Sequence, residues 1–380
     1  MNEPPSLPLG FSLASGSIGL RETRDTALVT MRDGATASAL FTRNSFPAAP
    51  ILVNREHLSR SKTVKALLIN TVFANACTGN AGLMKAKRCA EVTAECVGCA
   101  IEEVLVFSTG KIGSPLPLEK FEKGIPLLAA KPDDDIPGFA RAILTTDTVE
   151  KIACVRCGGA TVLGFAKGSG MICPDMATML AFVFTDARIE KERVDDVWKE
   201  ICDETFNRIS VDGCESTNDA AVVVAGQKIP VAESDLKGAL HTVAESLAIQ
   251  IARDGEGATM LVTCKVTGAA SATEAAAMAR RIVSSDLVKC AAHGHDPNWG
   301  RVMSAVGSLH ENIDPRTVRV SFNDTIVWDR GTAPAIDAET IFSRSDLIIT
   351  VDLRRGAARA LSWGCDLSHV YVDINAHYQT

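Results

Sequence analysis

Short apolar stretches alternate along this chain with longer stretches in which apolar residues recur at helical spacing. In the first half, the pattern predicts a strand at 67–70, a helix at 85–99, a strand at 104–107 and a plain loop at 131–138. On the predicted helix, Val92, Cys96 and Cys99 share one face, where small buried residues are expected. This mixture of elements is typical of an α/β protein.

The second half of the chain continues the alternation and ends in a β-rich pattern. It predicts helices over 194–209 and 236–251 around an apolar run at 220–225, then a strand at 260–266, a helix at 275–283 and strands at 318–322, 347–351 and 370–374. Ser271 and Glu274 have the spacing of a capping box before the helix at 275–283. We expect layered α/β architecture with a smaller C-terminal α/β lobe at about 290–380.

The composition is that of an ordinary globular protein. Of the 380 residues, 46% are hydrophobic and 22% are charged, which excludes a disordered chain, a collagen-like repeat and a small disulfide scaffold. The length favours one large domain or two packed lobes. With 39 basic and 46 acidic residues the formal charge is −7, so the chain lacks the basic surface that nucleic acid requires.

Cysteine usage and the N-terminus bear on the cellular setting. The 12 cysteines are too dilute for a disulfide framework in a chain of this length, which favours a reducing, cytoplasmic setting. The first basic residue is Arg21, and Pro4, Pro5 and Pro8 interrupt the stretch before it, so no secretory signal is predicted. Other uncharged runs are shorter than the roughly 20 apolar residues of a membrane helix, so no membrane partner is expected.

Two clusters have the spacing of metal sites. Cys96-x-x-Cys99 and Cys154-x-x-Cys157 together offer four thiolates, which suit tetrahedral zinc. The alternative is that these are buried free cysteines, with the second pair in one arm of a hairpin. His293-Gly-His295-Asp296 is either a metal site or a polar loop. The glycine signatures of dinucleotide-binding proteins, Walker-type NTPases and serine hydrolases do not occur in the sequence.

A glycine loop beginning at Lys167 leads into an apolar segment, with Thr178 at the junction. A threonine hydroxyl needs an adjacent base to act as a nucleophile. Cleavage between Ala177 and Thr178 would free an α-amino group with an ordinary pKa of about 7.7 to 8.0, which would place nucleophile and base on one residue. The alternative is that Thr178 only begins a buried strand.

Thr78 and Gly79 form a second candidate, because they follow the strand predicted at 67–70. A hydroxyl and a neighbouring glycine amide in a turn can donate hydrogen bonds to a developing oxyanion. The alternative is an ordinary turn at the end of a loop.

The segment Lys167-Gly-Ser-Gly-Met-Ile-Cys-Pro-Asp-Met-Ala-Thr178-Met-Leu180 resembles the self-cleavage segment of the bifunctional arginine-biosynthesis ornithine acetyltransferases, also called glutamate N-acetyltransferases. The resemblance extends from about residue 10 to the end of the chain. Its other strings are Phe41-Thr-Arg-Asn44, Ala48-Ala-Pro50, Asn75-Ala-Cys-Thr-Gly79, Thr145-Thr-Asp-Thr148, Ser216-Thr-Asn-Asp219, Arg253-Asp-Gly-Glu-Gly-Ala-Thr259, Asp296-Pro-Asn-Trp-Gly-Arg301, Trp363-Gly-Cys-Asp366 and Ile374-Asn-Ala376.

This resemblance implies an N-terminal-nucleophile-like layered α/β fold of the DmpA/ornithine acetyltransferase type. It also implies a precursor that cuts itself between Ala177 and Thr178. The products would be an α chain of residues 1–177 and a β chain of residues 178–380, which would remain together as an α2β2 heterotetramer.

The implied reaction is ping-pong acyl transfer in arginine biosynthesis. Thr178 would take the acetyl group of N-acetylornithine, release ornithine and pass the acetyl group to glutamate, without a cofactor. Thr78 and Gly79 would be the oxyanion donors. The residues that would line the substrate site with Thr178 are Thr146, Lys167, Glu256, Asn375 and Thr380, although the adjacent Thr145 fits the same motif. The sequence leaves open whether acetyl-CoA is also a donor.

Several positions depart from the family pattern. Val72 and Phe73 replace a glycine and an amide residue before the Thr78 loop, and valine tolerates a positive φ poorly, so a different backbone path is expected there. The other departures are Cys173, Met260 and Cys214-Glu215.

Two alternative functions remain open. One is an amidase or aminopeptidase on the same self-processing scaffold, with water as the acceptor. The other is a non-enzymatic binding protein stabilised by zinc on the four cysteines of the two pairs.

Overall fold

The structure is a computed structural model that describes residues 4–173, 179–344 and 346–377. Its larger sheet has two halves, which are joined by one long strand, β2 (Thr26–Phe41). The strands of this sheet are β1 (Phe11–Gly16), β2 (Thr26–Phe41), β3 (Val64–Asn70), β4 (Val104–Ser108), β5 (Lys151–Cys157), β6 (Ala160–Lys167), β7 (Leu180–Arg188) and β9 (Ala220–Pro230). Their order is β4-β3-β2-β9-β7-β6-β5, with β1 paired to β2. The first half of β2 pairs with β1 and β3, and its second half pairs with β9.

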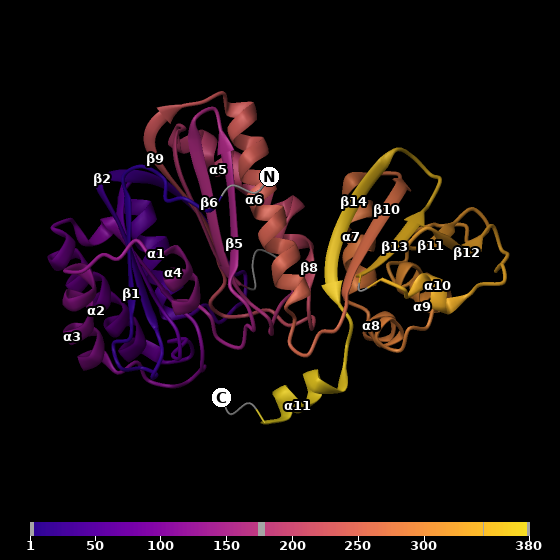
Figure 1. Ribbon diagram of the computed structural model, residues 1–380, viewed down its shortest axis with the longest axis horizontal. Helices are drawn as coiled ribbons and strands as arrows, with labels where there is room; N and C mark the ends of the chain where they lie inside the picture. Colours follow the sequence, from indigo (N-terminus) through magenta and orange to yellow (C-terminus); the bar gives the residue numbers. More distant parts are fainter. Residues whose placement is uncertain (1–3, 174–178, 345, 378–380) are drawn as a thin grey trace.

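The larger lobe has four layers, helix–sheet–sheet–helix, because the two sheet halves face each other (Figure 1). One outer face is covered by α1 (Ala49–Arg60), α2 (Gly79–Val97) and α3 (Leu118–Ala129), and the other by α5 (Lys191–Glu204) and α6 (Glu233–Arg253). Between the halves, Phe107 on β4 meets Phe182 on β7 edge to face, with ring centroids 5.0 Å apart. The short α4 (Ile136–Ala142) contributes Phe139 to this inner core. The layered α/β fold is confirmed.

Strand register brings several strand ends to one edge of the larger lobe. Lys167 at the end of β6 pairs with Leu180 at the start of β7, and Leu180 pairs with Ala220 at the start of β9. In the other half, the ends of β3 and β4 pair at Asn70 and Ser108. Loops that leave these strand ends therefore gather in one place, which is where a site can form.

The smaller lobe contains a six-stranded sheet with the order β12-β11-β13-β10-β14-β8. Its strands are β8 (Ile209–Ser210), β10 (Leu261–Ala269), β11 (Arg319–Phe322), β12 (Thr325–Asp329), β13 (Asp346–Asp352) and β14 (Ala358–Cys365). Its helices are α7 (Ala272–Val283), α8 (Asp286–His293), α9 (Trp299–Gly307) and α10 (Ala338–Ile341). Apart from the short β8, the first strand of this sheet along the chain is β10, so the continuous part of the lobe begins near residue 261, earlier than the expected 290.

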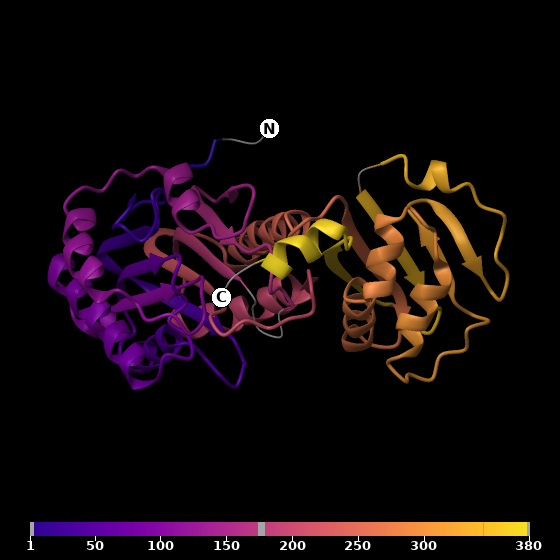
Figure 2. The ribbon, with the colours of Figure 1, turned by 90° about the horizontal axis from the view of Figure 1, so that it is seen from below.

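The last helix, α11 (His369–His377), leaves β14 and runs back toward the larger lobe (Figure 1, Figure 2). The sequence predicts a strand at 370–374, and this prediction is wrong. Alternation at Val370, Val372 and Ile374 has the period of a strand, but Val370 and Val372 are exposed and no described strand pairs with this segment. The alternation of apolar residues at 370–374 therefore does not identify a strand, because this segment is part of a helix.

Most other predicted elements are confirmed, with shifted boundaries. The predicted helix at 85–99 is α2, which ends at Val97; Cys99 lies beyond it, and Cys96 is exposed rather than buried. Ile209 belongs to β8 instead of continuing α5. The predicted loop at 131–138 ends in the first turn of α4, where the Asp135 carboxylate accepts the Gly138 N–H at 2.9 Å.

The predicted capping box before α7 is half present. The Ser271 hydroxyl accepts the N–H of Glu274 at 3.1 Å, as predicted. The Glu274 carboxylate instead accepts the N–H of Ala270 at 2.6 Å.

Among the residues that the structure describes, no helix combines the length and apolar character needed to cross a bilayer.

Candidate active site

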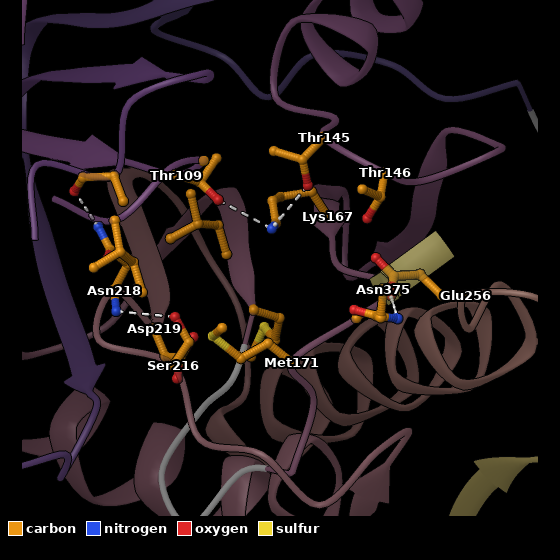
Figure 3. Close-up of a pocket in the computed structure, with 16 residues that line it drawn as sticks. Thr109, Thr145, Thr146, Lys167, Met171, Ser216, Asn218, Asp219, Glu256 and Asn375 are labelled. Carbon is orange, nitrogen blue, oxygen red and sulfur yellow. Dashed lines mark hydrogen bonds between the residues drawn. The ribbon is translucent and has the colours of Figure 1, made fainter. Parts of the chain in front are cut away.

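A cavity of about 240 Å³ lies where the ends of β4 and β6 and the starts of β7 and β9 meet (Figure 3). Its described lining residues include polar groups from loops that are far apart in sequence. They are Ala74, Thr109, Gly110, Ile112, Thr145, Thr146, Lys167, Gly170, Met171, Met179, Leu180, Ser216, Asn218, Asp219, Glu256 and Asn375.

The structure brings together four of the residues that the resemblance implies. Thr146, Lys167, Glu256 and Asn375 all line this cavity. Thr145 lines it as well, so both members of the ambiguous pair are present. Ala177, Thr178 and Thr380 lie outside the described residues, so their predicted roles stay predictions; Met179, which follows Thr178 in the chain, lines the cavity.

Thr78 and Gly79 do not line this cavity. Thr78 precedes α2, and its hydroxyl donates to the Asn75 Oδ1 at 2.8 Å. The proton of that hydroxyl is therefore already engaged. Gly79 is exposed, with a φ of 60°. The structure thus gives no support to the predicted oxyanion role of this pair.

Thr109 and Gly110 form a second Thr-Gly pair, which the sequence analysis missed. They follow β4 directly and line the cavity, and Thr109 is only 7% exposed. The Thr109 Oγ1 accepts a hydrogen bond from the Lys167 Nζ at 3.1 Å, which leaves the hydroxyl proton free to donate. The signal was available, because Ser108-Thr-Gly110 directly follows the strand predicted at 104–107.

Val72 contacts this second pair through its backbone. The expected change of backbone path at Val72 is wrong, because Val72 adopts a φ of 74°. Such a conformation is a genuine outlier for a β-branched residue and costs on the order of 1–3 kcal/mol. The Val72 carbonyl accepts the Lys111 N–H at 2.9 Å, and a Cβ at Gly110 (φ 127°) would overlap the Val72 backbone. Glycine at 110 is therefore required by close packing.

The other departures from the family pattern lie outside the cavity lining. Met260 is buried in the core of the smaller lobe. The carbonyl and the Sγ of Cys173 accept hydrogen bonds from Arg280 at 3.3 and 3.5 Å. Phe73, Cys214 and Glu215 also do not line the described cavity.

Lys167 is the central cation of the cavity. Its Nζ donates to Thr109 Oγ1 at 3.1 Å and to Thr145 Oγ1 at 3.2 Å (Figure 3). Burial lowers the pKa of this ammonium group below its ordinary value, although the Asp147 and Asp219 carboxyl groups oppose the shift. Because its two bonded partners are neutral hydroxyls, the ammonium group retains a donor for an anionic ligand.

Glu256 lies at the other side of the cavity and faces Asn375 (Figure 3). The Asn375 Nδ2 donates to the Glu256 Oε2 at 2.8 Å, which joins α11 to the loop after α6. A Cβ at Gly170 would overlap the Glu256 carboxylate, so glycine at 170 leaves room for this group. Glu256 thus offers an anionic site opposite Lys167.

Gly170→Ala is expected to raise the KM for a substrate with an ammonium group about tenfold, because the added methyl displaces the Glu256 carboxylate and weakens a charge-assisted hydrogen bond. The clash involves only the end of a flexible side chain, so the melting temperature should change little. Steady-state kinetics and thermal unfolding measure both effects. The matched control is Gly238→Ala on α6, where a Cβ meets open space; equal KM values in the two variants would contradict this placement of Glu256.

Asp219 is a buried carboxyl group in the cavity wall. It is 3% exposed, and its Oδ2 has no hydrogen-bond partner among the described residues. Burial raises the pKa of Asp219 well above its ordinary value, and the positive charge of Lys167 opposes this only in part. Burial therefore favours the neutral form of the Asp219 carboxyl group.

Asp219→Asn is expected to stabilise the uncut protein at neutral pH. Burial raises the pKa of this carboxyl group in the folded chain, so the folded chain holds the proton to a higher pH than the unfolded chain, whose carboxyl has an ordinary pKa of about 3.9. The folded state then binds more protons, so the free energy of unfolding falls as the pH rises above about 4. Asparagine removes this loss, and we expect a gain of about 1 to 3 kcal/mol at pH 7 that disappears near pH 4.

Chemical denaturation at both pH values measures this gain. The Thr178→Ala background, which is expected to keep the chain whole, provides a single unfolding species for the comparison. A variant that is less stable than its parent at pH 7 would contradict a raised pKa for Asp219.

The two metal hypotheses find no support among the described residues, where no cluster of three His, Cys, Asp or Glu side chains is suited to a metal ion. Cys96 lies in the last turn of α2 and Cys99 just beyond its end, whereas Cys154 and Cys157 lie on β5. The His293 Nδ1 is 2.9 Å from the Asp366 carboxylate, and His295 stacks on Phe342. The two cysteine pairs therefore lie on different elements, and the two histidines contact different residues.

Comparison with known proteins gives matches over almost the whole chain. The model of the ArgJ family matches residues 12–380. The chain is 40% identical to the arginine biosynthesis bifunctional protein ArgJ of Bacillus thuringiensis subsp. konkukian, over 98% of this chain and 96% of that protein. It is 41% identical to the protein of the same name from Geobacillus kaustophilus, over 98% and 95%.

One solved structure supports the same assignment. The arginine biosynthesis bifunctional protein argJ from Bacillus halodurans is 38% identical, with a TM-score of 0.50, and the match covers 52% of this chain and 98% of that chain. The family model and the relatives agree along the same residues. This protein therefore belongs to the ArgJ family.

Proposed function

We propose that this protein is an ornithine acetyltransferase of arginine biosynthesis, which moves the acetyl group of N-acetylornithine to glutamate through an ester on Thr178. The observation that carries the proposal is the cavity itself. It places a cation at Lys167, an anion at Glu256 and a Thr-Gly pair at Thr109 in one space beside Met179. The names of the relatives, which refer to arginine biosynthesis, support the same substrate class.

The reaction divides into two acyl transfers. In the first, the Thr178 hydroxyl attacks the acetyl carbonyl and its proton passes to the α-amino group of the same residue. Collapse of the tetrahedral intermediate breaks the amide bond, and the departing ornithine nitrogen takes that proton. In the second, the amino group of glutamate attacks the ester, and Thr178 recovers its hydroxyl proton. No cofactor takes part in either step.

Both steps pass through an oxyanion, which needs hydrogen-bond donors at a fixed position. We assign this role to the hydroxyl of Thr109 and the backbone N–H of Gly110, in place of Thr78 and Gly79. Thr109 lies in the cavity with its proton free, and the Lys167 ammonium that donates to its oxygen makes the hydroxyl a stronger donor.

The charges of the cavity suit a diamino acid. Lys167 can bind the substrate α-carboxylate, and Glu256 can bind the side-chain ammonium of N-acetylornithine. Thr146 supplies a further hydroxyl in the cavity lining, hydrogen-bonded to the Ser169 hydroxyl at 2.8 Å. Asn375 holds the Glu256 carboxylate, and the terminal Thr380 is assigned to the same end of the site by the family resemblance.

We further propose cleavage between Ala177 and Thr178 into chains 1–177 and 178–380. The relative from Bacillus halodurans supports this division, because 52% of the present chain covers 98% of that solved chain. A β chain of 203 residues would be about 53% of 380, a similar share. The α2β2 assembly, the cytoplasmic setting and the use of acetyl-CoA as a second donor belong to the proposal as well.

Ornithine release from N-acetylornithine, measured with and without glutamate, tests the function. Transfer predicts that release depends on glutamate, with N-acetylglutamate formed in equal amount. Equal ornithine release in both assays would instead identify a hydrolase, the amidase or aminopeptidase alternative.

A further inference from the structure

Lys151 is a fully buried lysine that joins two of the loops forming the cavity. Its Nζ donates to the Asp147 Oδ1 at 2.7 Å and to the Asp254 Oδ2 at 2.6 Å. The side chains of Lys151 and Asp147 are 0% exposed, and that of Asp254 is 6% exposed. None of the three lines the described cavity, so they do not act on a substrate directly.

Asp147 fixes the loop ends that carry Thr145 and Lys167. One carboxylate oxygen accepts the N–H of Thr145 at 3.0 Å, and the other accepts the N–H of Gly168 at 2.6 Å. Burial acts to raise the pKa of Asp147, but the ammonium groups of Lys151 and Lys167 outweigh it, so the pKa lies below its ordinary value. Asp147 is therefore an anion tied to the residue next to Lys167.

Asp254 fixes the loop that carries Glu256, two residues further along the chain. Its carboxylate accepts the N–H of Thr148 at 3.0 Å and also the Thr148 hydroxyl. The Glu256 N–H in turn donates to the Ser169 carbonyl at 2.8 Å. The loops at 145–148, 167–170 and 254–256 are thus linked pairwise, and Lys151 bridges the two carboxylates.

We propose that Lys151, held between Asp147 and Asp254, is a positioning residue that sets the separation of Lys167 and Glu256 and thereby the chain length of the diamino acid that the cavity accepts. The proposal rests on the proposed function, because it assumes that Lys167 binds the substrate carboxylate and Glu256 the side-chain ammonium. In a diamino acid, the distance between these two groups is set by the number of methylenes.

The energetics of the buried ion pairs between Lys151, Asp147 and Asp254 favour a role in positioning the loops over a role in stability. A buried ion pair gains little stability over apolar side chains of similar volume, since desolvation offsets the attraction. It does fix its partners in one geometry, because any displacement leaves a buried charge unpaired. A pocket that fits one chain length discriminates against one methylene more or less by about 10- to 200-fold.

Substrate selectivity of Asp254→Asn tests the proposal. Asp254→Asn keeps the ion pair between Lys151 and Asp147, so we expect this variant to fold. Lys151→Met would instead remove the ion pairs to both Asp147 and Asp254. The assay compares kcat/KM for N-acetylornithine with kcat/KM for the Nα-acetyl derivatives of lysine and of 2,4-diaminobutyrate, one methylene longer and shorter. We expect the preference for N-acetylornithine to fall about tenfold or more.

The matched control is Glu274→Gln in the smaller lobe. Glu274 is also a buried carboxylate, and it accepts the Ala270 N–H at 2.6 Å and pairs with Arg355 at 2.5 Å. Glu274→Gln should lower the melting temperature as Asp254→Asn does, while the preference for N-acetylornithine stays that of the wild type.

The outcomes separate this proposal from the proposed function. Wild-type protein that releases no ornithine from N-acetylornithine would overturn the function. Active wild type together with an Asp254→Asn variant whose preference is unchanged, or changed only as much as in Glu274→Gln, would overturn the positioning role of Lys151 and leave the function intact.

Discussion

Thr178→Ala is expected to yield one uncut chain of 380 residues that releases no ornithine from N-acetylornithine. The substitution removes the hydroxyl that we propose attacks the preceding peptide bond and later carries the acetyl group. Without cleavage, the α-amino group to which we assign the role of base also does not form. A denaturing gel and the ornithine-release assay measure the two losses on the same preparation.

Thr178→Ser is the matched control, because serine retains a hydroxyl and, after cleavage, an α-amino group. We expect it to be cut and to retain part of the activity. A Thr178→Ala protein that is cleaved or active would remove Thr178 from the mechanism.

Thr109→Ala is expected to lower kcat by about 10² to 10³ while KM changes little, because an oxyanion donor acts mainly in the transition state. Thr78→Ala should have a much smaller effect, since the Thr78 hydroxyl donates to Asn75 and does not line the cavity. Both substitutions remove the same atoms from a Thr-Gly pair, so each is the control for the other. Steady-state kinetics on processed protein gives the comparison.

The reverse result would restore the assignment made from the sequence. If Thr78→Ala lost the larger share of kcat and Thr109→Ala retained its turnover, the oxyanion donors would be Thr78 and Gly79. The loop at Thr78 would then have to move toward the cavity during the reaction.

Much of the fold follows from local pattern. Apolar spacing predicts β3, β4, α2, α6 and α7, because each of these elements buries one regular face. Alternation fails at α11, where Val370 and Val372 have the period of a strand but no described strand beside them. Pairing partners decide whether such a segment becomes a strand, and they are distant in the sequence.

The candidate site was predicted in part. The strings of the family resemblance lead to Thr146, Lys167, Glu256 and Asn375, and the structure brings all four to one cavity. The choice between two Thr-Gly pairs depends on which turn lies at that cavity, and both follow predicted strands. Sequence spacing alone therefore could not separate them.

The remaining features depend on contacts between distant segments. Lys151 and Asp254 are 103 residues apart, and neither residue type indicates burial by itself. Asp219 is unusual because its Oδ2 is buried without a hydrogen-bond partner among the described residues, which composition and periodicity do not report. Val72 keeps a positive φ because the surrounding backbone hydrogen bonds outweigh its intrinsic preference.

Intact mass spectrometry of the purified wild-type protein, under denaturing conditions, tests the central claim most directly. The account predicts two polypeptides from one gene product, the second of which begins with Thr178 and contains 203 residues. A preparation that transfers acetyl groups at full rate and contains only the unbroken chain of 380 residues would contradict it.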